Sequence, residues 1–307
     1  MPARFRRQRL LIVGCGDVGL RVARALADAA GRSSGQRMRL LALTSSAEKI
    51  PGLRQRGLTP LLGNLDHAAT LARLAGLAHR VIHLAPPPNQ GRQDPRTQAL
   101  ATALRRRTLP GSLVYGSTSG VYGDCRGEAV AETRATQGNT PRSIRRIDAE
   151  RQLRHLGRAA GVRTAILRIP GIYAPDRPNG TPALRLQKGT PVLRAEDDVY
   201  TNHIHADDLA RACIAALWRG KPQRIYHVND DTALLMGDYF DLAADILKLP
   251  RPPRVMRSAA QAQLPPLQLS FMSESRRLDN TRMKRELKLR LRYPSVAQGL
   301  APVLPAS

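Results

Sequence analysis

A strand, a glycine-rich turn and a helix open this chain, and this order constrains the fold more than any other feature of the sequence. The apolar run at residues 10–13 is followed by a GxGxxG turn and then by a helical pattern at residues 18–30. In such a turn the first glycine allows a tight bend, the second leaves room for a ligand beside the backbone, and the third lets the helix pack closely on the strand. The helix N-terminus then presents N–H groups to an anion. The pattern predicts a site for the pyrophosphate of a dinucleotide, made by Gly14, Gly16, Asp17, Val18 and Gly19.

Apolar runs bounded by turn residues alternate with helical patterns along most of the chain. The expected strands are residues 10–13, 39–43, 59–62, 80–84, 113–115, 163–167 and 225–228. The expected helices are residues 18–30, 67–77, 96–104 and 141–160, with shorter ones near 239–247 and 280–287. This alternation predicts an α/β protein with a doubly wound parallel sheet, the Rossmann fold.

Two proline-rich stretches, residues 170–195 and 250–266, interrupt the alternation. We therefore expect residues 1–170 and 195–232 to form the dinucleotide-binding domain. Residues 171–194 and 233–307 are expected to form a small substrate lobe at the carboxyl edge of the sheet.

The chain is strongly basic, with a net charge of +25 from 49 lysines and arginines, of which six are lysines. Such a charge favours an anionic partner. The arginines are spread along the whole chain, and aromatic residues make up only 4% of it, which argues against stacking platforms for single-stranded nucleic acid. We expect a small anionic substrate, and not a dedicated nucleic-acid partner.

The sequence predicts a cytoplasmic protein without a membrane segment. No stretch approaches the ~20 apolar residues that cross a bilayer. The basic N-terminus precedes only four apolar residues before Gly14, which is too short for a signal peptide. The three cysteines, at unrelated positions, are typical of reduced thiols.

Four further motifs follow the glycine turn in order: STSGVYG at 117–123, RIPGIYAP at 168–175, NHIHADDLA at 202–210 and YHVN at 226–229. Together these motifs resemble the extended short-chain dehydrogenases/reductases of the NAD-dependent epimerase/dehydratase group. The similarity reaches SRRLDN at 275–280 and YPS at 293–295. It implies an NAD(P)(H)-binding oxidoreductase or epimerase acting on a substrate such as a nucleotide-sugar.

The chain departs from this family at the catalytic Tyr-x-x-x-Lys pair. Aligning the glutamate that follows the pair with Glu150 places Arg142 at the tyrosine position and Arg146 at the lysine position. The chain thus resembles an atypical subgroup that keeps the fold and the cofactor site without the pair. Arginine stays protonated, so it cannot replace tyrosine as a general acid–base, but it can polarise a carbonyl or clamp an anion. The alternative is that both arginines are solvated side chains, partly paired with Glu150.

The family's Ser/Thr position corresponds to Thr118, whose hydroxyl can bind a substrate oxygen. The acid–base pair of sugar-nucleotide dehydratases corresponds to Ser119 and Gly120, which argues against dehydration. The predicted catalytic residues are Thr118, Arg142 and Arg146. The predicted substrate residues are Tyr122, Tyr173 and His203, although tyrosines in such motifs also serve as packing residues.

The resemblance also places the cofactor. Beyond the glycine turn, the expected contacts are Thr44, Ser45, Asn64, Leu65, Ala85, Pro86, Ser117, Arg146, Pro170, Gly171 and Ile172. The second strand ends in Thr44, Ser45 and Ser46, with no carboxylate to bind the ribose hydroxyls. We therefore expect NADP(H) to be favoured over NAD(H). Two functions remain open: an enzyme, or a non-catalytic NADP(H) sensor that regulates a partner.

Overall fold

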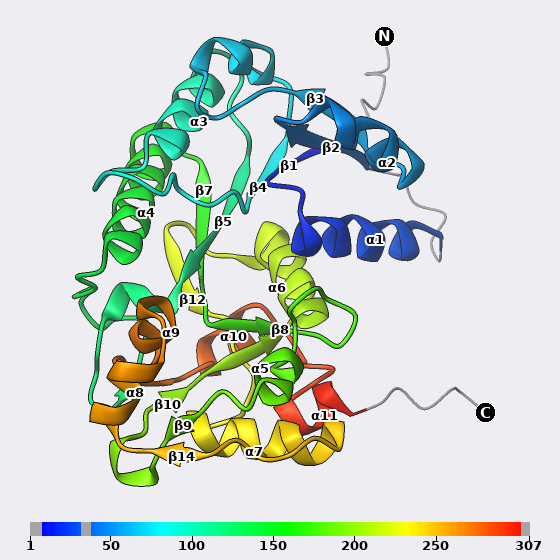
Figure 1. The fold of residues 1–307 in the computed structure, drawn as a ribbon. Coiled ribbons are helices and arrows are strands. Elements are labelled where there is room, and N and C mark those ends of the chain that lie inside the picture. The colour runs from blue at the N-terminus through cyan, green and yellow to red at the C-terminus, as the bar shows by residue number, and fades with distance from the viewer. Residues whose placement is uncertain (1–7, 32–37, 302–307) are drawn as a thin grey trace, which may run out of the picture.

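The computed structural model describes residues 8–31 and 38–301, and its centre is a seven-stranded parallel sheet with the order β12-β7-β5-β4-β1-β2-β3 (Figure 1). The strands of the sheet are β1 (Arg9–Val13), β2 (Arg39–Thr44), β3 (Thr59–Leu62), β4 (Arg80–His83), β5 (Ser112–Thr118), β7 (Arg163–Ile169) and β12 (Arg224–His227). The order reverses direction at β1, as in doubly wound sheets. The predicted Rossmann architecture is confirmed, and the late strand near 225–228 joins the sheet beside β7.

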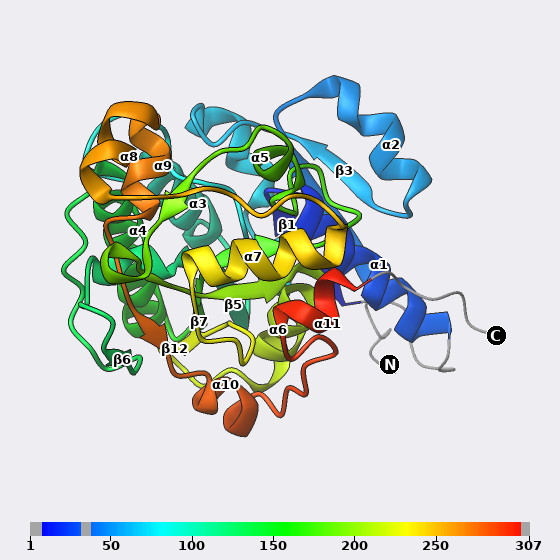
Figure 2. The same ribbon diagram turned by 60° about the horizontal axis from the view of Figure 1, so that its bottom comes forward.

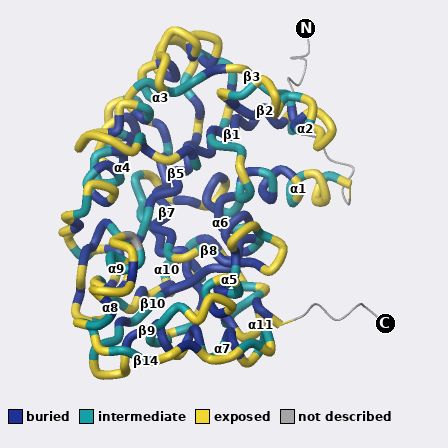
Figure 3. Tube along the Cα trace, in the orientation of Figure 1, coloured by how far each residue is buried: buried dark blue, intermediate teal, exposed yellow. Residues whose placement is uncertain are grey.

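Helices cover both faces of this sheet. One face carries α1 (Asp17–Gly31), α2 (Ile50–Gln55), α6 (Ala206–Arg219) and α10 (Thr281–Glu286). The other carries α3 (Pro95–Arg105) and α4 (Pro141–Ala160). The strands are apolar on both faces, for example Leu10 and Leu11 on opposite sides of β1, because both faces are buried. Figure 3 shows the buried strands in the middle of the molecule.

Local sequence explains where α4 begins. Thr140 caps the helix by accepting a hydrogen bond from the backbone N–H of Ser143 at 3.2 Å, and Pro141 occupies the first turn. Gly161, with φ of 68°, ends it in a left-handed conformation. These two ends orient twenty residues, including Arg142 and Arg146, along the sheet.

The predicted helix at 67–77 is wrong in type, because the chain forms a 3₁₀ helix at Ala68–Leu74. The hydroxyl of Thr70 donates to the carbonyl of His67 at 2.7 Å and accepts from the backbone N–H of Asn64 at 2.9 Å. Side-chain bonds of this kind compete with the backbone pattern of an α-helix. Two further 3₁₀ helices, Ala47–Lys49 and Ser119–Tyr122, follow β2 and β5, and another spans Ala195–Asp197.

Besides the two cores on the faces of the sheet, a third core lies beyond the carboxyl edge of the sheet. It is built from the later segments, which come to the front in Figure 2. Its helices are α5 (Ala183–Gln187), α7 (Met236–Leu247), α8 (Arg257–Gln263), α9 (Pro266–Phe271) and α11 (Val296–Leu300). Paired short strands connect it: β6 (Ala129–Val130) with β15 (Arg277–Leu278), β8 (Gly171–Tyr173) with β11 (His203–His205), β9 (Val192–Leu193) with β14 (Arg254–Val255), and β10 (Tyr200–Thr201) with β13 (Leu234–Leu235). Within the described residues, no helix is both long and apolar enough to span a membrane.

Candidate functional site

The three glycines of the turn between β1 and α1 meet three different surroundings. Gly14 has a φ of 82°, and a Cβ there would lie 2.3 Å from the backbone nitrogen of Ala85. A Cβ on Gly19 would lie 3.1 Å from Cγ2 of Ile12, which fits close packing of α1 on β1. A Cβ on Gly16 would have no heavy atom of residues 8–31 and 38–301 within 4 Å. The turn is therefore tight on two sides and open at Gly16, as a passage for a pyrophosphate requires.

The ends of the neighbouring strands lie around this turn. The carbonyl of Thr44, at the end of β2, accepts a hydrogen bond from Gly63 at 2.9 Å, immediately before Asn64 and Leu65. Arg96 forms a bidentate pair with Asp66 and donates to the carbonyl of Pro86 at 3.2 Å. This arginine connects the predicted adenine side, after β3, to the predicted ribose side, after β4.

Sequence reasoning missed one cation near the turn, Arg56 at the end of α2. Burial raises the pKa of the Cys15 thiol to about 11, and the nearby Arg56 guanidinium acts in the opposite direction. A positive charge thus lies beside the glycine turn, on the side of the helix that follows β2. Its only signal in the sequence is an arginine in the short segment after Thr44.

Arg146 lies against the end of β5. Its Nη1 donates to the hydroxyl of Tyr115 at 3.0 Å and to the carbonyl of Gly116 at 2.6 Å, and its buried Nε has no partner in the described structure. Arg142, one turn earlier on α4, is more exposed. Partial burial and the Arg146 guanidinium lower the pKa of Arg142, while the charge of Glu274 raises it.

Neither arginine pairs with Glu150. That carboxylate forms a buried ion pair with Arg168 of β7, at 2.7 Å, and accepts a hydrogen bond from the hydroxyl of Ser117 at 2.6 Å. The expectation that Glu150 partly pairs with Arg142 is therefore wrong, because Glu150 faces the sheet. The hydroxyl of Ser117, predicted as a cofactor contact, is engaged inside the protein.

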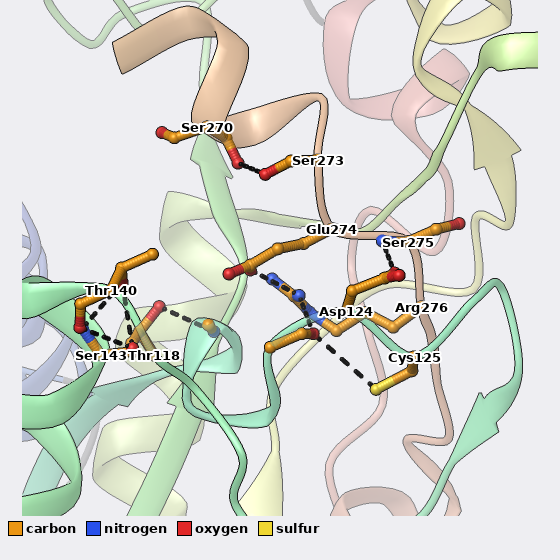
Figure 4. A network of polar contacts seen from close by, with 12 residues as sticks. Thr118, Asp124, Cys125, Thr140, Ser143, Ser270, Ser273, Glu274, Ser275 and Arg276 are labelled. Atoms are coloured by element: carbon orange, nitrogen blue, oxygen red, sulfur yellow. Dashed lines mark hydrogen bonds and ion pairs between the residues drawn. The ribbon is translucent and has the colours of Figure 1, made fainter. Parts of the chain in front are cut away.

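The side chains of Thr118 and Glu274 both lie close to Gly120. The hydroxyl of Thr118 accepts from the backbone N–H of Gly120 at 3.3 Å. A Cβ on Gly120 would lie 3.6 Å from Oγ1 of Thr118 and 4.0 Å from Oε2 of Glu274. The space that a side chain at 120 would fill is thus flanked by a hydroxyl and a carboxylate. Figure 4 shows Glu274 extending from its loop toward Thr118, Thr140 and Ser143.

Hydrogen bonds of the two following residues, Ser275 and Arg276, hold the loop that carries Glu274. The backbone N–H of Ser275 donates to Asp124 at 2.8 Å, and its carbonyl accepts from Cys125 and Gly127 at 3.0 and 3.1 Å. Arg276 pairs with Glu274 at 2.7 Å and donates to the carbonyl of Gly123 at 2.8 Å (Figure 4). Residues 119 and 120 carry no acid, but a carboxylate from a distant part of the sequence lies beside them.

The three predicted substrate residues are buried instead of lining this site. Tyr122 is 1% exposed, and its hydroxyl lies 2.5 Å from Nε2 of His227. Because Nδ1 of His227 lies 3.0 Å from the carbonyl of Asp279, which can only accept, Nδ1 carries the proton and Tyr122 donates to Nε2. Burial lowers the pKa of His227 to about 3.

Tyr173 and His203 lie in the core below the sheet. The hydroxyl of Tyr173 donates to the carbonyl of Ser295 at 3.2 Å. His203 stacks on Tyr239 with ring centroids 4.0 Å apart, and burial lowers its pKa to about 3. The rings of Tyr122, Tyr173 and His203 thus fill the interior where the later segments meet the sheet.

The loop after β7 leads back toward the glycine turn. Pro170 precedes β8, and Gly171 and Ile172 begin that strand, which pairs with β11. Arg177 donates to the carbonyl of Ile172 at 2.9 Å, and its Nε lies 3.4 Å from the carboxylate of Asp17. Val18 packs against the core under α1.

Comparison with known proteins supports this architecture. The model of the NAD dependent epimerase/dehydratase family matches residues 11–229. A functionally unknown conserved protein from Silicibacter pomeroyi superposes with a TM-score of 0.75 and 28% identity, over 95% of this chain and 96% of that one. No curated protein matches significantly.

Two solved structures share the fold at lower identity. The UDP-glucose 4-epimerase of Thermotoga maritima, solved with UDP-glucose, has a TM-score of 0.76 and 18% identity, over 95% of this chain and 96% of that one. The dTDP-glucose 4,6-dehydratase of Streptomyces venezuelae, solved with NAD, has a TM-score of 0.76 and 22% identity, over 96% of this chain and 95% of that one.

Proposed function

The chain belongs to the NAD-dependent epimerase/dehydratase family, and we propose that it is an NAD(P)(H)-binding oxidoreductase or epimerase of atypical chemistry. The observation that carries the proposal is the open face at Gly16, bounded by the tight contacts of Gly14 and Gly19. These surroundings fit a dinucleotide whose pyrophosphate lies at the start of α1. Thr44 and Ser45 would lie toward its adenosine half, and Gly171 and Ile172 toward its nicotinamide half.

The reaction site is proposed to lie at the end of β5. A bound nicotinamide would exchange hydride with a substrate carbon. Thr118 can donate a hydrogen bond to the substrate oxygen once its hydroxyl rotates, and Arg142 can bind an anionic group of the substrate. Glu274 supplies a carboxylate beside Thr118, and a carboxylate can serve as a general base, a role that arginine at the tyrosine position cannot take.

We also propose a preference for NADP(H). The end of β2 carries Thr44 and Ser45 instead of a carboxylate, which leaves room for a 2′-phosphate. The hydroxyl of Thr44 is bonded to the backbone of Ser46, so Ser45 offers the hydroxyl at this strand end that could bind the phosphate. Arg56 adds a positive charge near the glycine turn. Charge-assisted bonds from a guanidinium to phosphate are among the stronger hydrogen bonds in proteins.

A non-catalytic NADP(H) sensor is the second candidate. It is favoured by the arginines at positions 142 and 146 and by the engagement of the Tyr122 and Tyr173 hydroxyls in the interior. Under this proposal the cofactor changes the protein's interaction with a partner, and the cluster around Thr118 performs no turnover.

Calorimetric titration with NADPH and NADH tests the binding proposal. We expect NADPH to bind more tightly, and failure of both to bind would refute it. Incubation with NADP⁺ or NADPH and a panel of UDP- and dTDP-sugars, followed by nicotinamide absorbance and product chromatography, then separates the two candidates. Turnover supports the enzyme, and binding without any turnover supports the sensor.

A further inference from the structure

The loop between β8 and α5 folds back onto the start of α1. Within it the backbone N–H of Ala174 donates to Gly180 at 3.1 Å, Gly180 donates to Arg177 at 2.9 Å, and Arg177 donates to Ala174 at 3.2 Å. These three bonds close residues 174–180 into a compact turn. Asp176 and Arg177 lie at its tip, and both reach α1.

Two ion pairs join this tip to α1. Asp176 pairs with Arg21 at 2.7 Å, and Nε of Arg177 lies 3.4 Å from Asp17. Asp17 is the first residue of α1 and directly follows Gly16. Arg177 therefore contacts the residue that directly follows Gly16, although it is far from the glycine turn in the sequence.

The charges at this point are unfavourable for a diphosphate unless a cation compensates them. Asp17 is the first residue of α1, so its carboxylate adds negative charge near the helix N-terminus that would receive a phosphate, and like charges repel. Arg21 pairs with Asp17, but it is buried, and its Nε, Nη1 and Nη2 all bind aspartates: Asp17, Asp207 and Asp176. Because the Arg21 side chain is only 5% exposed and each of its nitrogens already binds a carboxylate, it is not accessible to a ligand.

Arg177, in contrast, still has N–H groups that could bind a phosphate. Its Nη1 binds the carbonyl of Ile172, its Nε lies at a long 3.4 Å from Asp17, and its Nη2 has no hydrogen-bond partner within residues 8–31 and 38–301. The side chain is 28% exposed. A guanidinium held in this way by one carbonyl and one carboxylate can turn Nε and Nη2 toward phosphate oxygens without moving the backbone.

Given the proposed dinucleotide at the glycine turn, we propose that Arg177 binds its pyrophosphate and neutralises the charge that Asp17 places there. The Asp176–Arg21 pair holds the loop in position for this contact. The loop thereby connects the nicotinamide side, at Gly171 and Ile172, to the phosphate side, at Gly16.

The test compares Arg177→Gln with Arg24→Gln, because Arg24 lies on α1, is exposed and pairs with Asp207 at 3.2 Å. Both variants lose one positive charge near the same helix. We expect Arg177→Gln to raise the Kd for NADPH about tenfold or more, because a charge-assisted hydrogen bond is lost. The Kd of this variant should also depend less on salt concentration. Arg24→Gln should match the wild type in both respects.

A third variant covers the case in which Arg177→Gln does not fold. Arg177→Lys keeps the charge with fewer donors, and we expect it to bind NADPH more weakly than the wild type but more tightly than any folded Arg177→Gln protein. Unchanged NADPH binding in the Arg177 variants, or equal weakening in Arg24→Gln, overturns the assignment while leaving the proposed function intact. Absence of NADPH binding by the wild type overturns the proposed function itself.

Discussion

The hydroxyl of Thr118 and the carboxylate of Glu274 face each other across the missing side chain of Gly120, 3.6 and 4.0 Å from the position its Cβ would take. Glycine at this position keeps that space open. A hydroxyl that binds an oxygen and a carboxylate that exchanges a proton are the two groups needed to interconvert an alcohol and a carbonyl beside a nicotinamide. Under the proposed function, these two groups would supply the acid–base chemistry that arginine at the tyrosine position cannot.

Replacing Glu274 with glutamine is expected to remove that chemistry. The amide keeps the size and the contact with Arg276 but cannot accept the proton, so turnover of any sugar nucleotide that the wild type converts should fall by about 10²–10⁴. The Kd for NADPH should stay unchanged, because Glu274 lies at the substrate end. The control is Glu196→Gln, an exposed glutamate of the 3₁₀ helix Ala195–Asp197. Undiminished turnover in Glu274→Gln would remove this residue from the reaction.

Arg56 is expected to determine part of the preference for NADPH. Its charge lies near the glycine turn, so Arg56→Gln should weaken NADPH binding about tenfold while leaving NADH binding nearly constant. The comparison is Arg54→Gln, which removes an exposed arginine from the same short helix. If the ratio of the NADPH and NADH dissociation constants is the same in both variants, Arg56 does not contact the 2′-phosphate.

Asp230 is expected to make the free energy of unfolding depend on pH. It is 1% exposed, its Oδ2 has no partner among the described residues, and burial raises its pKa from 3.8 to about 7. The folded state therefore holds this proton more tightly than the unfolded state. The resulting stabilisation is fully present below pH 3.8 and is lost as the pH rises toward about 7.

Asp230→Asn should remove this dependence and be the more stable protein above pH 7, since its amide does not ionise. The measurement is urea unfolding of both proteins across this pH range. The free energy of unfolding of the wild type should fall, relative to the variant, as the pH rises. Parallel pH profiles would show that Asp230 titrates normally.

The sheet could be predicted from the sequence because its determinants are local. Runs such as residues 10–13 and 165–167 are apolar on both faces, which is typical of a buried parallel strand, and Thr140 and Pro141 set the start of α4. The type of helix at 67–77 could not be predicted, since it depends on one threonine hydroxyl. The contacts of Gly14, Gly16 and Gly19 match the roles their spacing predicts.

The candidate site was less predictable because its side chains come from distant segments. Glu274 and Arg177 reach positions 120 and 17 through loops whose paths depend on the third core, and no local pattern encodes those paths. Tyr122, Tyr173 and His203 lie in motifs near the site, but the two tyrosine hydroxyls bind internal partners and the His203 ring stacks on Tyr239. The position of these residues in the motifs predicted which part of the fold they lie in, but it did not predict where their side chains point.

The most direct test of the account is NADPH titration of Gly16→Ala beside Gly31→Ala. Among the residues that the structure describes, a Cβ at either position meets no heavy atom within 4 Å, and neither glycine has a positive φ, so both variants should keep the wild-type Tm. Only the methyl group at position 16 projects into the proposed pyrophosphate passage, and we expect it to raise the Kd for NADPH about tenfold or more. Gly31→Ala should bind NADPH as the wild type does. Wild-type affinity in Gly16→Ala would contradict a dinucleotide at this turn.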